Sequence, residues 1–360
     1  PKANTNKKYI MWGTHFGSID NNFIMPKTGE EVYIPDGVAH FLEHKMFEQE
    51  NGKNSLDVLM ALGIDANAYT TNDHTAYLFE CSNKFYEGLD ELMDYVQHPY
   101  FTDENVEKEK GIIAQEIKMY DDDPGWRMYI NAMDCMYKNN PVKLDIAGTV
   151  ESISKITPDV LYKCYNTFYN PSNMTMVVCG DFVPEDLLEE IKKRLVKKEP
   201  QGEIKRIYPP KENKINKPYK EDEMEVSMPI FAIGYKDNEE LKENRENIIK
   251  KHIAIEILLN IAIGKSSDLY KELYESGDLL AEPDLDYEFS DEYAHVLISG
   301  QSTNPKKIYE KVKETFEKYK QDGLDEEHFN RIQRKIYGDY VVEYNSVGDI
   351  ARMFLSDKMK

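Results

Sequence analysis

The chain has 360 residues and a mass of 42.0 kDa, which is long for one hydrophobic core and predicts two domains. Its 66 acidic residues outnumber 45 Lys and Arg residues, and the net charge of -21 argues against nucleic acids and anionic membranes as partners. The same acidity favours a cationic ligand electrostatically, but it is equally explained by the charge that keeps a protein in solution.

The cysteine spacing and the absence of recognisable targeting segments predict the redox state of the cysteines and the location of the protein. The four cysteines show no C-x-x-C spacing and are predicted to be reduced core residues, as Cys81, Cys135, Cys164 and Cys179. No apolar run approaches the ~18 residues that a membrane span needs, and no signal peptide is recognisable. We therefore predict a cytoplasmic protein. The chain starts at Pro1 rather than Met, and we expect both of its ends to be trimmed.

Strand and helix patterns alternate through the first part of the chain. Strands are predicted at 8–16, 66–71, 75–81 and 174–179, with Asn72-Asp73 as a hairpin turn between the second and third. Helices are predicted at 36–47, 55–62, 84–97, 103–120, from 158 onward and at 184–197, and residues 20–35 are predicted to be a loop.

The second part repeats this order of elements at an offset of about 220 residues, which predicts a duplicated domain. Its strands are predicted at 226–235, near 285 and at 294–299, and its helices at 247–263, 267–274, 305–319 and 325–340. Residues 198–223 are rich in Lys, Glu and Pro and are predicted to be the linker. The expected domains are thus 1–197 and 224–360, the second one truncated.

The helix at 36–47 carries the most informative pattern, H-x-x-E-H. Asp36 is predicted to cap it, and apolar residues recur along it at helical intervals. At 100° per residue, His44 lies about 40° from His40 and Glu43 about 60° to the other side. Two imidazoles and one carboxylate therefore point toward one spot.

This spacing is the inverzincin motif, in which two histidines four residues apart bind one zinc ion. Glu43 would lie beside the attacking water, where it can accept a proton and pass it to the leaving amine. A catalytic zinc takes three protein ligands, so one ligand is still missing. The alternative is a surface helix whose charged face contains two histidines and a glutamate by chance.

The helix at 103–120 offers two carboxylates for the missing role. Glu109 and Glu116 are seven residues apart, within about 20° on one helix face, and Ile112 and Ile113 lie between them. A buried role and a solvated acidic face are both compatible with this pattern. The acidic-face reading fits Glu109 better than Glu116, because charged residues surround Glu109.

Several separated motifs resemble the pitrilysin-like metallopeptidases, the family of insulin-degrading enzyme and mitochondrial processing peptidase. The short bacterial processing-peptidase-like members look most similar, and the likeness covers most of residues 8–196. Its motifs are GVAHFLEH at 37–44, NAYT at 67–70 with TAY at 75–77, GT at 148–149, YNPSNM at 169–174 and GD at 180–181.

The resemblance implies a fold and a site. The implied fold is α+β, with two homologous α/β domains that each have a mainly antiparallel sheet covered by helices on one face. The implied metal ligands are His40, His44 and Glu116, which hold one Zn²⁺ per chain, while Glu109 supports the site from a second position. The hairpin strand that runs along the substrate contributes Asn67, Ala68, Tyr69 and Thr70.

We therefore expect a zinc-dependent endopeptidase that hydrolyses extended peptides, with Glu43 as the general base. The alternative is a peptide-binding or assembly subunit of a processing-peptidase-like complex with little turnover of its own. The second domain lacks the Arg that catalytic members carry in the stretch matching 267–270. Substrate clamping would then come from a partner chain, in a homodimer or in a heterodimer with a related chain, and half of such a chamber would be poorly active alone.

Overall fold

The computed structural model describes residues 1–239 and 245–359, which form two compact units. Unit 1 comprises Pro1–Lys118, Leu144–Tyr208 and Glu343–Lys360, and unit 2 comprises Met119–Lys143 and Pro209–Val342. The units are therefore discontinuous in sequence, unlike the continuous ranges 1–197 and 224–360 expected above. The expected fold class is confirmed, because both units combine helices with antiparallel sheets.

A four-stranded antiparallel sheet in the order β4-β5-β1-β6 is the framework of unit 1. Its strands are β1 (Lys8–Thr14), β4 (Asp65–Thr70), β5 (Thr75–Cys81) and β6 (Met174–Cys179), at the positions predicted from the sequence. Trp12 of β1 lies opposite Tyr77 of β5 and Met176 of β6. The strand β4 is at the edge, paired with β5 alone among the described strands.

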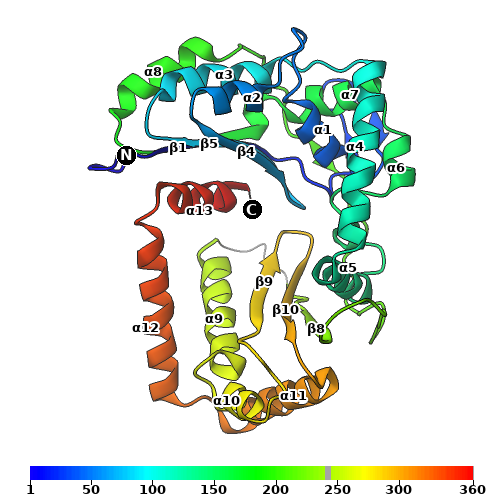
Figure 1. Ribbon diagram of the computed structural model, residues 1–360, viewed down its shortest axis with the longest axis vertical. Helices are drawn as coiled ribbons and strands as arrows, with labels where there is room; N and C mark the ends of the chain where they lie inside the picture. The colour runs from blue at the N-terminus through cyan, green and yellow to red at the C-terminus, as the bar shows by residue number, and fades with distance from the viewer. Residues whose placement is uncertain (240–244, 360) are drawn as a thin grey trace. The chain divides into compact units, whose positions relative to one another are not determined.

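Most helices of unit 1 cover one face of this sheet (Figure 1). They are α1 (Val38–Lys45), α2 (Ser55–Ala61), α3 (Phe85–Gln97), α4 (Asp103–Asp121), α6 (Val150–Ser154), α7 (Pro158–Phe168) and α8 (Pro184–Arg194), with a short 3-10 turn η2 (Pro171–Asn173). Ile10 and Trp12 project from β1 into their core, beside Phe41 and Leu42 of α1. The site helix α1 is thus packed directly against the sheet.

The opposite face of the sheet is covered by α13 (Val347–Met359), which the sequence analysis did not predict. Figure 1 shows α13 on the side of the sheet away from α3 and α8. Tyr9 and Met11 alternate with Ile10 and Trp12, so they project toward α13 and pack against Leu355. Both faces of β1 are therefore buried.

The beginning of the predicted linker is fixed to unit 1 by a small sheet in the order β3-β2-β7. Its strands are β2 (Asn22–Ile24), β3 (Glu31–Tyr33) and β7 (Lys205–Arg206), so the predicted loop at 20–35 and the predicted linker both contain strand. Arg206 Nε and the Tyr208 hydroxyl donate to Asp20 Oδ1 at 2.8 and 2.7 Å. Asp20 is 1% exposed, and burial raises the pKa of its carboxyl despite these donors.

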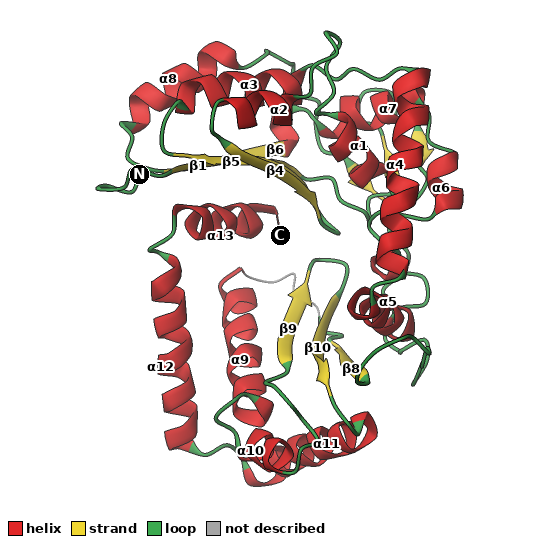
Figure 2. Ribbon diagram, viewed as in Figure 1, coloured by secondary structure: helices red, strands yellow, loops and turns green. Residues whose placement is uncertain are grey.

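Unit 2 is built on a three-stranded antiparallel sheet in the order β8-β10-β9, which Figure 2 shows beside α9. Its elements are β8 (Ile230–Lys236), β9 (Asp284–Phe289), β10 (Ala294–Gln301), α5 (Pro124–Met136), η1 (Pro141–Lys143), α9 (Arg245–Ile263), α10 (Asp268–Glu275), α11 (Pro305–Asp322) and α12 (Glu326–Glu343). Phe231 and Ile233 of β8 pack with α9, α10 and α11. The helix α5 was not predicted from the sequence. It packs closely on β8, because Met136 of α5 occupies the space that a side chain at Gly234 would need.

The start of α1 depends on a close approach between two backbone segments. Gly37 is the N-cap residue with φ 91°, and a Cβ there would lie 2.4 Å from the carbonyl oxygen of Ala147. A Cβ on Gly148 would lie 2.5 Å from the oxygen of Asp36. The prediction that Asp36 caps α1 is wrong, because its side chain accepts a hydrogen bond from Asn21 instead.

The four cysteines are unpaired, as the sequence predicts, and Cys81, Cys164 and Cys179 are buried while Cys135 is partly exposed. Burial raises the pKa of the Cys81 thiol to about 11 and that of Cys179 above its ordinary value. These thiols are therefore protonated at neutral pH and serve as small apolar side chains.

Candidate metal centre

The helix α1 carries two imidazoles and a carboxylate within an otherwise apolar segment. Phe41 and Leu42 are fully buried in the core, and the carboxylate of Glu43 is buried with them. The side chains of His40 and His44 are 12% and 26% exposed, and their ring centroids are 4.5 Å apart. These polar groups face the few neighbours that can satisfy them, because burying them unpaired would be costly.

The helix α4 brings a third donor to the two imidazoles. His40 Nε2 lies 3.7 Å from Glu116 Oε1, and His44 Nε2 lies 3.6 Å from Glu116 Oε2. One ligand atom from each of the three residues can be chosen so that all lie within 4.8 Å of one another. Within residues 1–239 and 245–359, this is the cluster of His, Cys, Asp and Glu side chains that has metal-binding geometry.

Glu109 contacts the other side of the His44 ring. Its Oε1 lies 3.2 Å from His44 Nδ1, so the neutral ring donates its Nδ1 proton to this carboxylate and keeps the Nε2 lone pair toward Glu116. Glu109 is only 8% exposed, so it is buried. It does not belong to a solvated acidic face, which was the alternative that its sequence neighbours favoured. A carboxylate that orients a histidine in this way is the usual support of a metal-bound imidazole.

The two histidines differ in the direction of their pKa shifts. Burial, reinforced by the neighbouring His44, lowers the pKa of His40 to about 3, so His40 is neutral over the physiological range. Burial also acts to lower the pKa of His44, but the Glu109 hydrogen bond and the nearby carboxylates outweigh it and raise that pKa. For Glu109, burial is outweighed by His44 and Lys45, and the pKa falls below its ordinary value.

The carboxylate of Glu43 is held by the hairpin strand β4. Burial raises the pKa of Glu43, and a hydrogen bond from Thr70 opposes that rise. The Thr70 hydroxyl donates to Glu43 Oε2 at 2.7 Å. Sequence reasoning placed Thr70 in the substrate strand but missed this contact, because nothing in the spacing of residues 43 and 70 shows that they meet.

The remaining residues of the predicted substrate strand point alternately to the two faces of the sheet. Ala68 packs toward the helical core, whereas Tyr69 packs toward the α13 side. The Tyr69 hydroxyl is 3.1 Å from His74 Nε2, and Asn67 is exposed, with its side-chain oxygen accepting from the Ala68 amide at 2.9 Å. The structure therefore places Asn67, Ala68 and Tyr69 along an open sheet edge that ends at Thr70 and Glu43.

The donor set fits zinc. Ligands at ~2.0–2.1 Å in a tetrahedron lie about 3.3 Å apart, close to the 3.6 and 3.7 Å separations from Glu116 to the two Nε2 atoms. Two imidazole nitrogens and a carboxylate oxygen are ligands that zinc prefers, and three protein ligands leave a fourth position for water or substrate. His40 Nδ1 has no hydrogen-bond partner in the described part of the chain, so no protein group competes with a metal for the orientation of this ring from that side.

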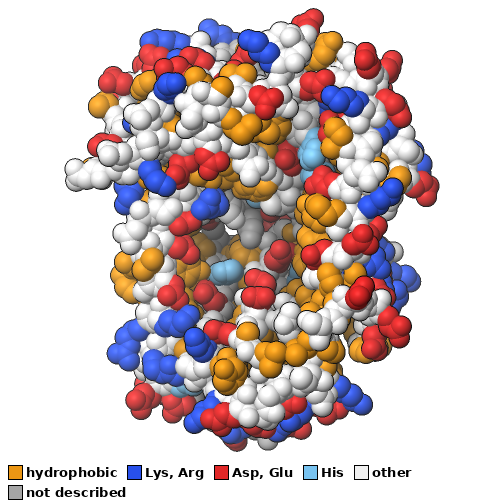
Figure 3. All heavy atoms as spheres, viewed as in Figure 1, with side chains coloured by type: hydrophobic (Ala, Val, Ile, Leu, Met, Phe, Trp, Pro, Cys, Tyr) orange, Lys and Arg blue, Asp and Glu red, His pale blue; other side chains and the backbone are white. Residues whose placement is uncertain are grey.

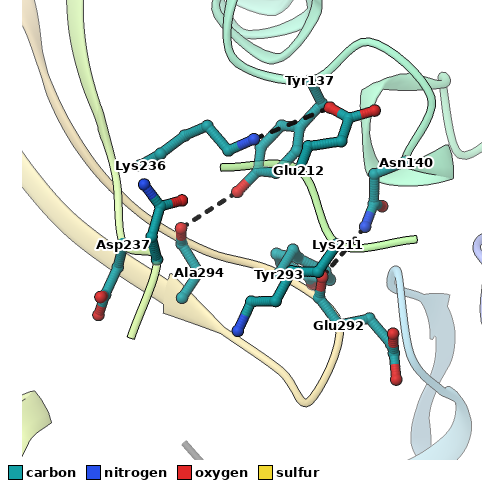
Figure 4. Close-up of a pocket in the computed structure, with 10 residues that line it drawn as sticks. Tyr137, Asn140, Lys211, Glu212, Lys236, Asp237, Glu292, Tyr293 and Ala294 are labelled. Carbon is teal, nitrogen blue, oxygen red and sulfur yellow. Dashed lines mark hydrogen bonds and ion pairs between the residues drawn. The ribbon is translucent and has the colours of Figure 1, made fainter. Parts of the chain in front are cut away.

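A cavity in unit 2 does not compete with this site (Figure 4). It has a volume of about 10 Å³, which is room for about one water molecule. Tyr137 and Lys236 line it, and the Tyr137 hydroxyl donates to the carbonyl of Ala294 at 3.2 Å. Such a space is far too small for a peptide.

The charge distribution and the helices bear on possible partners. Asp and Glu side chains are interspersed with Lys and Arg on the face drawn in Figure 3, rather than gathered in one acidic patch. The described residues contain no helix that is both long enough and apolar enough to cross a bilayer.

Family models match both parts of the chain. The model described as Insulinase (Peptidase family M16) matches residues 30–150, which contain α1 and α4. The model described as Peptidase M16 inactive domain matches residues 155–336. All of the residues of the candidate metal centre lie within the first of these matches.

Individual proteins match nearly the whole chain. YmfH of Bacillus subtilis, named as an uncharacterized zinc protease, is 39% identical over 358 residues, covering 98% of this chain and 82% of YmfH. The crystal structure of a putative M16-like peptidase from Alicyclobacillus acidocaldarius is 34% identical with a TM-score of 0.93, covering 100% of this chain and 84% of that one. The first half of the periplasmic protease PqqL from Escherichia coli shares the fold at 18% identity, with a TM-score of 0.73 and coverage of 99% and 78%.

The contact between Thr70 and Glu43 predicts a stability difference between two matched variants. Thr70→Val is nearly isosteric but removes the donor to a buried carboxylate, so we expect a loss of about 1.5–3 kcal/mol in the free energy of unfolding of the metal-free protein. Thr70→Ser keeps the hydroxyl and should lose less. Urea denaturation measures both, and equal stability of the Val and Ser variants would contradict the assigned hydrogen bond.

Proposed function

The chain belongs to the M16 peptidase family, and from this membership we propose that it is a zinc-dependent endopeptidase that hydrolyses extended peptides. The observation that carries the proposal is the convergence of His40, His44 and Glu116 beside the buried carboxylate of Glu43. A structural zinc site would be expected to have a fourth protein ligand, usually a cysteine, and no cysteine belongs to this cluster.

In this proposal His40 Nε2, His44 Nε2 and a Glu116 oxygen hold one zinc ion per chain, and Glu109 orients His44 from behind. Zinc supplies Lewis acidity toward the scissile carbonyl and toward water. Glu43 accepts the proton of the attacking water and donates it to the leaving amine. Thr70 fixes the Glu43 carboxylate through its 2.7 Å hydrogen bond, so the base is oriented before substrate arrives.

The substrate would bind as an additional strand along β4. An edge strand offers backbone donors and acceptors to an extended peptide, and this mode reads the backbone while tolerating varied side chains. Asn67, Ala68, Tyr69 and Thr70 would line the peptide, and the strand leads it to Glu43 because Thr70 is the last residue of β4. The net charge of -21 would help to steer cationic peptides toward the protein.

The alternative function is a peptide-binding or assembly subunit with little turnover of its own. It is favoured by the description of the model that matches residues 155–336, which names an inactive domain. That match excludes α1 and α4 entirely, however, whereas the Insulinase model covers the whole metal cluster. The retained cluster therefore favours the peptidase.

A partner chain is part of the proposal. The match to a structure described as the first half of PqqL covers 99% of this chain. We infer that this chain likewise supplies one half of a working peptidase, and that a second copy or a related chain supplies the other in a homodimer or heterodimer. PqqL is described as periplasmic, so the cytoplasmic location of this chain stays a prediction.

The ligand assignment predicts an order of zinc affinities. Glu116→Gln removes a ligand and should weaken zinc binding by more than the ~10–100-fold expected for Glu109→Gln, which removes a supporting hydrogen bond. Glu107→Gln, on the exposed side of α4, is the matched control and should bind like wild type. Competition with a chromophoric chelator gives the three affinities. Wild-type affinity in the Glu116→Gln protein would refute this ligand set.

The role of Glu43 predicts an inactive protein that still binds metal. Glu43→Gln is nearly isosteric but cannot accept a proton, so kcat for peptide hydrolysis should fall by ~10²–10⁴-fold while zinc content is unchanged. The exposed Glu50→Gln variant is the control. Hydrolysis of a mixed peptide pool, followed by mass spectrometry, measures the loss. Equal and negligible turnover in wild type and variant would instead favour the subunit hypothesis.

The two-half proposal predicts that activity depends on association. The specific activity of the isolated chain should be low when it is monomeric and should rise with protein concentration, or on addition of the partner chain, as the second half is supplied. Light scattering after size-exclusion chromatography gives the mass at each concentration. Full activity from a strict monomer would show that one chain is sufficient.

A further inference from the structure

Lys45, the last residue of α1, is buried in a way that is rare for a lysine. It directly follows His44, and its side chain has no exposed surface. Lysine is almost never fully buried unless its charge is paired, because an ammonium group loses its hydration on burial. The sequence contains one indication of this burial: Lys45 lies between the H-x-x-E-H motif and the apolar residues Met46 and Phe47.

The partners of Lys45 connect it to the metal centre. Its Nζ donates to Glu48 Oε2 and lies 3.5 Å from Glu109 Oε2. The other oxygen of Glu109, Oε1, is 3.2 Å from His44 Nδ1. Lys45 and His44 therefore engage the two oxygens of a single buried carboxylate.

The positive charge of Lys45 offsets the cost of burying the Glu109 carboxylate. In the state that binds metal through Nε2, His44 is neutral and gives Glu109 a hydrogen bond but no balancing charge. An isolated carboxylate is expensive to bury. Lys45 is the cationic side chain that the described structure places against Glu109. Glu48 is 33% exposed, so Lys45 is anchored on one side by a partly solvated carboxylate and on the other by the buried one.

We propose that Lys45 is a positioning residue of the metal centre: its ammonium holds Glu109 against the His44 ring, so that His44 keeps Nδ1 protonated and Nε2 directed to the metal. This inference rests on the proposed zinc site. It adds to that site a charged residue that touches neither metal nor substrate and acts through Glu109.

The sign of the effect separates this role from simple electrostatics. A lysine close to a zinc site repels the dication, so on Coulomb's law alone its removal would tighten zinc binding. The positioning role requires the opposite. Loss of Lys45 should release Glu109, and through it His44, and should weaken zinc binding by ~10–100-fold, the usual effect of losing an orienting partner.

The test compares zinc affinities of purified full-length variants, measured by competition with a chromophoric chelator. Lys45→Met removes the charge and should bind zinc at least tenfold more weakly, whereas Lys45→Arg keeps the charge and should recover most of the affinity. Lys110→Met is the matched control: Lys110 is next to Glu109 in sequence but pairs with Glu107, and its loss should leave affinity within twofold of wild type.

A double-mutant cycle tests whether Lys45 acts through Glu109. In the Glu109→Gln background, Lys45→Met should cause no further loss of zinc affinity, because the link is already broken. An equal loss in both backgrounds would overturn the proposal, as would unchanged or tighter zinc binding by Lys45→Met alone. If circular dichroism shows that Lys45→Met does not fold, Lys45→Gln takes its place in the same cycle.

A spectroscopic readout without metal separates positioning from general damage. In the metal-free protein, at a pH high enough for the His44 ring to be neutral, the ¹⁵N chemical shifts of the ring report which nitrogen carries the proton. Wild type and Lys45→Arg should show the Nδ1–H form, and Lys45→Met a mixture of tautomers; the same form in all three would overturn the proposal. A wild-type chain that binds no zinc would overturn the zinc site as well, whereas zinc binding indifferent to Lys45 would overturn this inference alone.

Discussion

The contact between His44 and Glu109 is the interaction on which the site depends, because it joins two helices that lie 65 residues apart in the sequence. It fixes which nitrogen of His44 faces Glu116, and it sets α4 so that Glu116 reaches both imidazoles at 3.6–3.7 Å. On the other side of α1, Thr70 performs the corresponding task for Glu43. Two elements thus orient the polar groups of one buried helix: α4 holds His44, and β4 holds Glu43.

This arrangement requires a rigid surrounding. The start of α1 is held where Gly37 and Gly148 let two backbone segments approach, and its apolar side is anchored by Phe41 and Leu42 in the main core. The sheet behind α1 is itself packed on both faces, by the helical layer and by α13. Displacements of a few tenths of an ångström matter for metal ligands, and a strand buried on both faces limits them.

The sequence was sufficient for whatever depends on local pattern. The H-x-x-E-H spacing on one helix face, the hairpin at Asn72-Asp73 and the strands of the two larger sheets, β4-β5-β1-β6 and β8-β10-β9, follow from periodicity, and the structure has them close to the predicted positions. What it could not supply were contacts between distant segments. The helix α13 was missed, and the strands that it packs against, β1, β5 and β6, are all distant from it in the sequence. The roles of Thr70 and Lys45 depend on neighbours that spacing does not reveal.

Charge balance explains why a divalent cation suits this centre. Glu43, Glu109 and Glu116 are buried or partly buried carboxylates, while burial keeps His40 neutral and Lys45 contributes one positive charge. The three carboxylates of this largely buried cluster therefore outnumber its one lysine charge. Isolated charges are costly there, so a dication held by His40, His44 and Glu116 would stabilise the folded site as well as supply its chemistry. The residues that orient the site and the residues that would bind the metal are therefore parts of one electrostatic arrangement, in which Lys45 balances the carboxylate that the metal does not reach.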